Sequence, residues 1–166
     1  GNNVVWSGFN ENGASAYFYD GTTTIELPEN VGQGQVPRIS GNKIVGIGIS
    51  NDGMSGDVFL YDGVRNNQLG HTDGWDLFPV IAGNHIAWKS LVDDVFEVFV
   101  YEAGQAKQLS FNSIRTYGPV VSENFVAWSA DHGDGFEIYA YDGVSIIQLT
   151  DDVFDDWLPN IDGDSI

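Results

Sequence analysis

The stretch 136–143, Phe-Glu-Ile-Tyr-Ala-Tyr-Asp-Gly, contains the pattern that decides the fold. Its last three residues, Tyr-Asp-Gly, also occur at 19–21 and 61–63, and a variant, Tyr-Glu-Ala-Gly, occupies 101–104. The four tyrosines are 42, 40 and 40 residues apart. Prolines repeat with the same spacing, at Pro37, Pro79, Pro119 and Pro159. Because periods of about 20–50 residues are typical of solenoids, propellers and arrays, these markers indicate four copies of one structural unit.

Each copy predicts four short antiparallel strands. In the last full copy the expected strands are 119–122, 125–130, 136–141 and 144–149, and Asp142-Gly143 is a hairpin signal. The second strand carries an apolar pair ending in tryptophan, which recurs as Val5-Trp6, Ala87-Trp88 and Ala127-Trp128, with Val45-Gly46 as a degenerate copy. The third strand is apolar on both faces, so neighbouring sheets are expected to cover both sides of it. The sequence therefore predicts an all-β protein, a β-propeller of four-stranded antiparallel blades.

The repeats divide the chain into 1–40, 41–82, 83–122 and 123–162, and 163–166 begins a further repeat within a single domain, 1–166. The first copy supplies only the last three strands of a blade, whereas 159–162 has the pattern of a first strand. Three arrangements stay open. A four-bladed ring could be closed by 159–162, the velcro closure of propellers. Two chains could form one eight-bladed ring, or the chain could belong to a longer propeller.

The charge balance restricts the partners. The chain has 24 acidic and 6 basic residues and a formal net charge of −18, which disfavours nucleic-acid binding. It has no cysteine and no apolar run of the length that spans a membrane. The acidic surface predicts either simple solvation or the attraction of cations such as Ca²⁺.

Residues 134–150, which run from Asp-Gly-Phe-Glu-Ile-Tyr to Gln-Leu-Thr, resemble the TolB-type β-propeller repeat. The resemblance covers essentially the whole chain, although the family's Ser-Pro-Asp-Gly turn is replaced by Gly-Asn at 41–42 and 83–84, a variant similar to surface-protein propellers. It implies an exported, extracellular or cell-surface protein, and binding or scaffolding more often than catalysis. A glycan-active enzyme domain of lyase or hydrolase type and a structural unit of a surface assembly are the alternatives.

One face of the expected propeller carries the loops that join successive blades and the loops between second and third strands. These loops hold most of the acidic residues together with exposed aromatic candidates. Rings beside carboxylates suit recognition of a protein or a glycan. We predict a ligand site formed by Trp75, Tyr117, Trp157, Asp73, Asp76 and Asp156. The alternative is that the tryptophans pack between blades.

A second prediction concerns calcium. Asp131 and Asp134, in the sequence Asp-His-Gly-Asp-Gly, offer the hard oxygen ligands that Ca²⁺ prefers, although such residues also simply form turns. No histidine spacing typical of zinc sites, no Gly-x-Ser-x-Gly nucleophile elbow and no phosphate-binding glycine loop occurs. The sequence therefore predicts no catalytic residue and no cofactor other than a possible Ca²⁺.

Overall fold

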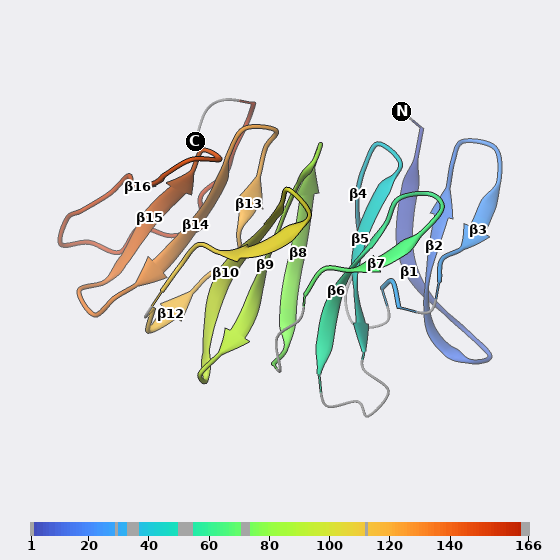
Figure 1. The fold of residues 1–166 in the computed structure, drawn as a ribbon, viewed down its shortest axis with the longest axis horizontal. Helices are drawn as coiled ribbons and strands as arrows, with labels where there is room; N and C mark the ends of the chain where they lie inside the picture. The colour runs from blue at the N-terminus through green and yellow to red at the C-terminus, as the bar shows by residue number, and fades with distance from the viewer. Residues whose placement is uncertain are drawn as a thin grey trace.

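The computed structural model describes residues 2–28, 30–32, 37–49, 55–70, 74–111 and 113–163. Every helix or strand element in these ranges is a β-strand, and the strands form four antiparallel sheets. The sheets stand in a row in chain order, with the N-terminal and C-terminal sheets at opposite ends of the row (Figure 1). Each sheet corresponds to one expected blade, and we call them blades 1 to 4.

The blades differ slightly in their strands. Blade 1 contains β1 (Val4–Asn10), β2 (Gly13–Tyr19) and β3 (Thr24–Glu26). Blade 2 contains β4 (Arg38–Ser40), β5 (Lys43–Ile49), β6 (Gly56–Tyr61) and β7 (Asn66–Gln68). Blade 3 contains β8 (Asp76–Ala82), β9 (His85–Val92), β10 (Val95–Glu102) and β11 (Gln105–Gln108). Blade 4 contains β12 (Arg115–Thr116), β13 (Val120–Val121), β14 (Val126–Asp131), β15 (Phe136–Tyr141) and β16 (Ile146–Gln148).

Apolar clusters fill the spaces between neighbouring blades. The buried members between blades 1 and 2 are Ala16, Leu27, Val31 and Ile44. Those between blades 2 and 3 are Val45, Ile47, Val58, Leu69, Ile86 and Trp88. Those between blades 3 and 4 are Ala87, Val98, Val100, Leu109, Val126, Trp128, Ala130 and Tyr141. Because each large apolar side chain contributes about 1.5–3 kcal/mol when buried, the blades stabilise one another through these three clusters.

The tryptophans of the second strands make the same contact in three blades. Trp6 stacks on Tyr17, Trp88 on Phe99 and Trp128 on Tyr139, with ring centroids 5.7–6.0 Å apart and interplanar angles of 17–21°. Each pair lies directly opposite across two hydrogen-bonded strands. Trp88 and Trp128 therefore fill the space toward the preceding blade, whereas Trp6 of blade 1 is 37% exposed.

Blade 2 has Gly46 at this position, and the structure shows why. A Cβ atom on Gly46 would lie 2.8 Å from the backbone nitrogen of Gly32. The N–H of Gly32 donates to the carbonyl of Ile47 at 3.1 Å, and Val31 is buried beside it. The segment 30–32 thus occupies the space that a tryptophan side chain fills in the other blades.

The predicted all-β, antiparallel architecture is confirmed, and the predicted third strand 136–141 coincides with β15. The first strand of blade 4 differs from the prediction, because it is split into β12 and β13, which both pair with β14. The described sheets do not close into a ring. Among the described strand pairs, β1 pairs with β2. Residues 160 and 161 lie beside a surface depression that β13 also borders.

Candidate functional site

Three aromatic rings meet on the loop face of blade 4. The centroids of Tyr117 and Phe136 are 5.0 Å apart, and the ring of Trp157 lies 6.1 Å from Phe136 and 6.5 Å from Tyr117. Phe136 is buried, whereas Tyr117 is 40% exposed and Trp157 is 53% exposed. Tyr117 and Trp157 each precede a repeat proline by two residues, so the repeat itself brings them to equivalent places.

Backbone hydrogen bonds hold both loops against the ends of β14 and β15. The N–H of Tyr117 donates to the carbonyl of Ser129 at 3.0 Å, and the N–H of Asp156 donates to the carbonyl of Phe136 at 2.7 Å. The Asp155 carboxylate accepts the N–H of Phe136 at 2.9 Å. The rings of Tyr117 and Trp157 are therefore carried by loops that are fixed to the sheet.

A charged pair lies beside the rings. The Nη2 of Arg115 donates to Oδ2 of Asp131 at 2.8 Å, and its guanidinium carbon is 4.8 Å from the centroid of Phe136. The Arg115 guanidinium, together with the N–H of Gly133, holds the pKa of the Asp131 carboxyl below its ordinary value. The same pairing raises the pKa of Arg115. The Arg115 side chain is mostly exposed, so it can contact a partner while Asp131 fixes its direction. We call Arg115, Tyr117, Asp131, Phe136 and Trp157 the blade 4 aromatic site.

Of the other predicted ligand residues, Asp156 adjoins this site through its bond to Phe136, whereas Trp75 does not lie there. Trp75 is half-buried and packs over Gly56, where an added Cβ would be 2.9 Å from its ring. This agrees with the alternative in which a tryptophan packs between blades. Asp156 is half-buried and Asp73 lies outside the described residues.

Asp76 is fully buried and has a structural role. Its carboxylate accepts the N–H of Val58 at 3.2 Å, in the space that Gly70 leaves open. The equivalent N–H groups of the next two blades donate to hydroxyls instead, that of Val98 to Ser110 and that of Ile138 to Thr150. Because Asp76 is out of reach of a surface ligand, we leave it out of the proposed site.

The two residues predicted to bind calcium, Asp131 and Asp134, lie in different surroundings. Asp131 is committed to Arg115, whose positive charge opposes a cation at the same carboxylate, whereas Asp134 is exposed. Within the described ranges, no three acidic or histidine side chains come together as a possible metal site.

Sequence reasoning missed Arg115 and Phe136. A usable signal existed, because Arg115 is one of only 6 basic residues and lies two residues before Tyr117, in a segment that the sequence pattern assigns to a loop of the acidic face. The sequence pattern predicts Phe136 only as the first residue of a strand, which gives no sign of its place beneath the two exposed rings.

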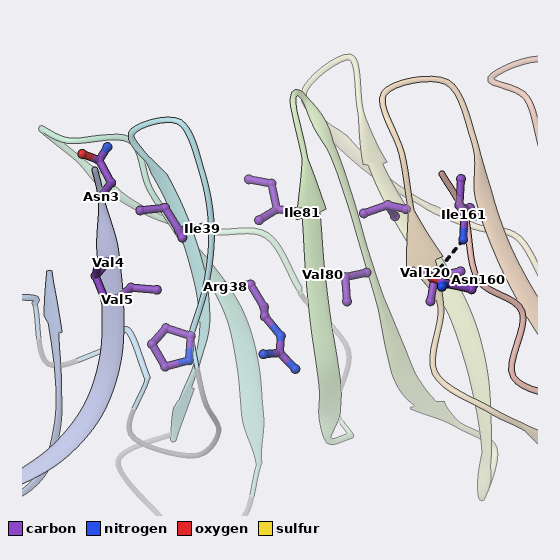
Figure 2. Close-up of a pocket in the computed structure, with 12 residues that line it drawn as sticks. Asn3, Val4, Val5, Arg38, Ile39, Val80, Ile81, Val120, Asn160 and Ile161 are labelled. Carbon is purple, nitrogen blue, oxygen red and sulfur yellow. Dashed lines mark hydrogen bonds between the residues drawn. The ribbon is translucent and has the colours of Figure 1, made fainter. Parts of the chain in front are cut away.

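A second feature lies along one edge of each blade, beside the first strands of blades 2 to 4 and β1 of blade 1. The inner edges of the blades border a depression of about 570 Å³, which is mostly apolar. Figure 2 shows Val4 and Val5 of β1 on one side, Ile161 with Val120 on the other, and Arg38 pointing into the space between. Separately, none of the described residues belongs to a helix that is long and apolar enough to cross a bilayer.

No protein-family model and no curated protein matches the chain. Solved structures do match it. The propeller domain of the Trilobed protease from Pyrococcus furiosus, described as having an open velcro topology, gives a TM-score of 0.69 at 16% identity, covering 90% of this chain and 52% of that one. The fold is that of a β-propeller.

Two other propeller-containing proteins show the same likeness. The acylaminoacyl peptidase of Pyrococcus horikoshii gives a TM-score of 0.68 at 16% identity, covering 91% of this chain and 26% of that one. TolB from Acinetobacter baumannii gives a TM-score of 0.61 at 16% identity, covering 89% of this chain and 40% of that one. The propeller chain thus spans about half or less of each of these proteins. At these identities the likeness establishes the propeller fold and not a TolB-type assignment.

Proposed function

We propose that this propeller is a non-catalytic binding module that recognises a protein partner through the blade 4 aromatic site. The observation that carries the proposal is the convergence of Arg115, Tyr117 and Trp157 on one loop face, with both rings substantially exposed. Tryptophan, tyrosine and arginine are the residue types that dominate binding energy at protein interfaces.

The construction of the site supports this role. Phe136 lies beneath the exposed rings, and the loops of Tyr117 and Trp157 are hydrogen-bonded to the sheet. Side chains that are already held in place lose little conformational freedom when a partner binds. The site therefore has the rigidity expected of an interface rather than that of a loosely ordered loop.

The surroundings suggest the chemistry of the partner. The exposed carboxylates of Asp151, Asp152 and Asp155 lie in the same loop as Trp157, and the chain carries a net charge of −18. Such a surface attracts basic segments and weakens as salt screens the charges. A partner segment that combines lysine or arginine with an apolar or aromatic anchor fits both features.

A glycan is the second candidate, and the half-exposed Trp157 ring favours it. A flat apolar ring beside the exposed guanidinium of Arg115, which Asp131 holds in place, is a surface on which a sugar ring can stack and hydrogen-bond. The glycan-active enzyme of the sequence analysis is the competing hypothesis here. It predicts that bound polysaccharide is shortened, whereas a binding module leaves its length unchanged.

The test is a selection followed by matched variants. A peptide library and a glycan array are screened on the immobilised chain, and the best binder is then titrated by calorimetry against Trp157→Ala, Arg115→Ala and Phe154→Ala. Phe154 is a strongly exposed aromatic residue in the same loop and is the control. We expect the first two variants to lose roughly 30-fold or more in affinity, the loss typical of a hot spot, and the control to bind normally.

Three outcomes decide the proposal. Loss in both site variants with a peptide binder supports protein recognition, and the same loss with a glycan supports the second candidate. Unchanged affinity in Trp157→Ala and Arg115→Ala, with the fold intact by circular dichroism, overturns the site. Export or attachment to the cell surface belongs to this proposal, and fractionation of the source cells checks it.

A further inference from the structure

Phe78 combines an unusual backbone conformation with an exposed side chain. Its φ angle is 54°, in the left-handed region, where a bulky residue is an outlier. The next residue is Pro79, and a residue before proline normally takes an extended backbone. The Phe78 side chain is 53% exposed, so burial offsets only part of this strain. Positions that break local conformational rules in this way are where function is expected.

The repeat separates this conformation from the phenyl ring. β8 has an irregular register between Leu77 and Val80, and such a bulge turns the intervening side chain away from the alternation of the strand. Leu158, which precedes Pro159, has nearly the same φ angle, 57°. Two different side chains thus share one backbone shape. The ring at position 78 is therefore not what forces the backbone into it.

Phe78 lies against the loop that carries Tyr117. A Cβ atom on Gly118 would be 3.4 Å from the Cβ of Phe78, and Gly118 directly follows Tyr117 in the chain. Because Gly118 has no side chain, the backbone at Phe78 packs directly on this segment. The exposed ring of Phe78 therefore extends the blade 4 aromatic site toward blade 3.

A buried cation lies beside Phe78. The Nζ of Lys89 is 5.7 Å from the ring centroid of Phe78 and 4.8 Å from that of Phe96. It donates to the carbonyl of Thr116 at 2.7 Å, and the hydroxyl of Thr116 donates to the carbonyl of Phe96 at 2.6 Å. β12, which contains Thr116, lies near β10, which contains Phe96 (Figure 1). These contacts hold the Phe78 ring at the junction of blades 3 and 4.

Blade 3 thus repeats the plan of the blade 4 aromatic site. Phe96 and Phe136 share one repeat position. Each has a cationic group 4.8 Å from its ring centroid, Lys89 in blade 3 and Arg115 in blade 4. An exposed aromatic ring accompanies each pair, which in blade 3 is that of Phe78. The face therefore carries two similar groups of rings on neighbouring blades.

Exposed carboxylates flank both groups of rings. Asp93 and Asp94 form the turn between β9 and β10, just before Phe96. On the other side, the exposed carboxylates of the Trp157 loop are those of Asp151, Asp152 and Asp155. Acidic groups at both ends of an aromatic strip are complementary to a segment that carries basic residues around apolar ones.

We infer that Phe78 is a second anchor position of the recognition face, and that the partner is an extended basic segment with two apolar side chains. One of these side chains packs on Phe78 and the other on the rings of Tyr117 and Trp157. The inference rests on the proposed function, because both anchors belong to the same face. A single apolar side chain or one sugar ring reaches only the blade 4 aromatic site. A segment that spans both anchors binds more tightly, because the second contact forms within the complex.

Defined peptides test the number of anchors. The probes are lysine-rich peptides with one tryptophan, and the same peptides with two tryptophans separated by about two to six residues, each of which spans roughly 3.3 Å when extended. Calorimetry measures their affinity for the wild-type chain. We expect the best two-tryptophan peptide to bind about tenfold or more tightly than the one-tryptophan peptide.

Variants then locate the second anchor. Phe78→Gly should reduce the affinity for the two-tryptophan peptide to that for the one-tryptophan peptide, and should leave the latter unchanged. Its melting temperature should stay near that of the wild type, because glycine adopts the left-handed backbone without strain, which offsets the lost contact with Lys89. Phe9→Gly is the matched control, since Phe9 is an exposed phenylalanine of β1, on another blade.

The outcomes separate this inference from the proposed function. If Trp157→Ala weakens both peptides while Phe78→Gly weakens neither, the second anchor is overturned and the proposed function stands. The second anchor is also overturned if no two-tryptophan peptide binds the wild type more tightly than the one-tryptophan peptide, a result that depends on no variant. If Trp157→Ala leaves both affinities unchanged, the proposed function fails, and the second anchor fails with it.

Discussion

Trp128 and Trp6 occupy the same repeat position and stack on the same kind of partner, yet one is buried between blades and the other lies at the end of the row. Their ring geometry is nearly identical, with centroids 5.8 and 5.7 Å from Tyr139 and Tyr17. The comparison shows that the repeat specifies the stacking of tryptophan on tyrosine within one blade. Whether the stacked rings are buried depends on the presence of a neighbouring blade.

The largest expected effect on stability comes from removing each of these two tryptophan rings in turn. Trp128→Ala should lower the free energy of unfolding by about 3–5 kcal/mol, because it leaves a cavity in the cluster between blades 3 and 4. Trp6→Ala removes the same ring from a partly exposed position and should cost about 1 kcal/mol or less in the dilute monomer. Urea unfolding at low protein concentration checks both values, and equal losses would mean that the neighbouring blade contributes nothing.

Glycine at the tryptophan position offers a second comparison. Gly46→Ala places a Cβ atom against the Gly32 backbone and should cost about 1–3 kcal/mol, the usual cost of overpacking. Gly8→Ala, on β1, meets only the ring of Tyr17 and should cost less than about 1 kcal/mol, since that side chain can move. Thermal melts of the two variants rank them, and a reversed order would contradict the account of segment 30–32.

Buried glutamates at one repeat position differ in the number of their donors. Glu97 accepts from the N–H of Ser113 at 3.0 Å and from the hydroxyls of Ser113 and Ser110. Glu137 accepts from the hydroxyl of Thr150 at 2.5 Å. Glu97→Gln should therefore cost about 1–3 kcal/mol and Glu137→Gln about 1 kcal/mol or less. Chemical denaturation of both variants checks the ranking, and the account is wrong if Glu137→Gln is the more damaging change.

The smallest expected effect concerns Lys89 of blade 3. It occupies the repeat position that Ser129 occupies in blade 4. Its Nζ donates to the carbonyl of Thr116 at 2.7 Å, and burial lowers the pKa of Lys89 below its ordinary 10.5. The unfolded chain then binds this proton at pH values where the folded chain has released it. The stability of the wild type should therefore rise with pH, toward 10.5, relative to Lys89→Met.

The expected difference is about 1 kcal/mol or less between pH 8 and pH 10. Urea midpoints of wild type and Lys89→Met at the two pH values measure it. Lys43→Met removes the same charge from a half-buried position and is the control. A stability difference that does not change with pH would show that the Lys89 ammonium is not disfavoured by folding.

The sheets could be predicted because their signals are local. The Tyr-Asp-Gly turns, for example, work through one side chain: Asp142 accepts the N–H groups of Val144 and Ser145, and Asp62 accepts those of Val64 and Arg65. These bonds lie within four residues, so the sequence alone reveals them.

The site could be predicted only in part, because exposure depends on distant residues. Trp75 and Trp157 stand in equivalent loops, but Gly56 of the preceding blade gives Trp75 a place to pack. Asp76 is buried because Gly70 leaves room for its carboxylate, and Arg115 finds Asp131 across 16 positions of sequence. Such pairs become visible only when the blades are placed side by side.

The row of blades also determines how the molecule opens. Blades 2 and 3 have a neighbour on both sides, while blades 1 and 4 each have one (Figure 1). In such a one-dimensional series, fraying from the ends requires the loss of a single cluster, whereas opening in the middle requires the loss of two. Amide protons of β1 to β3 should therefore exchange with solvent sooner than those of β9 and β10.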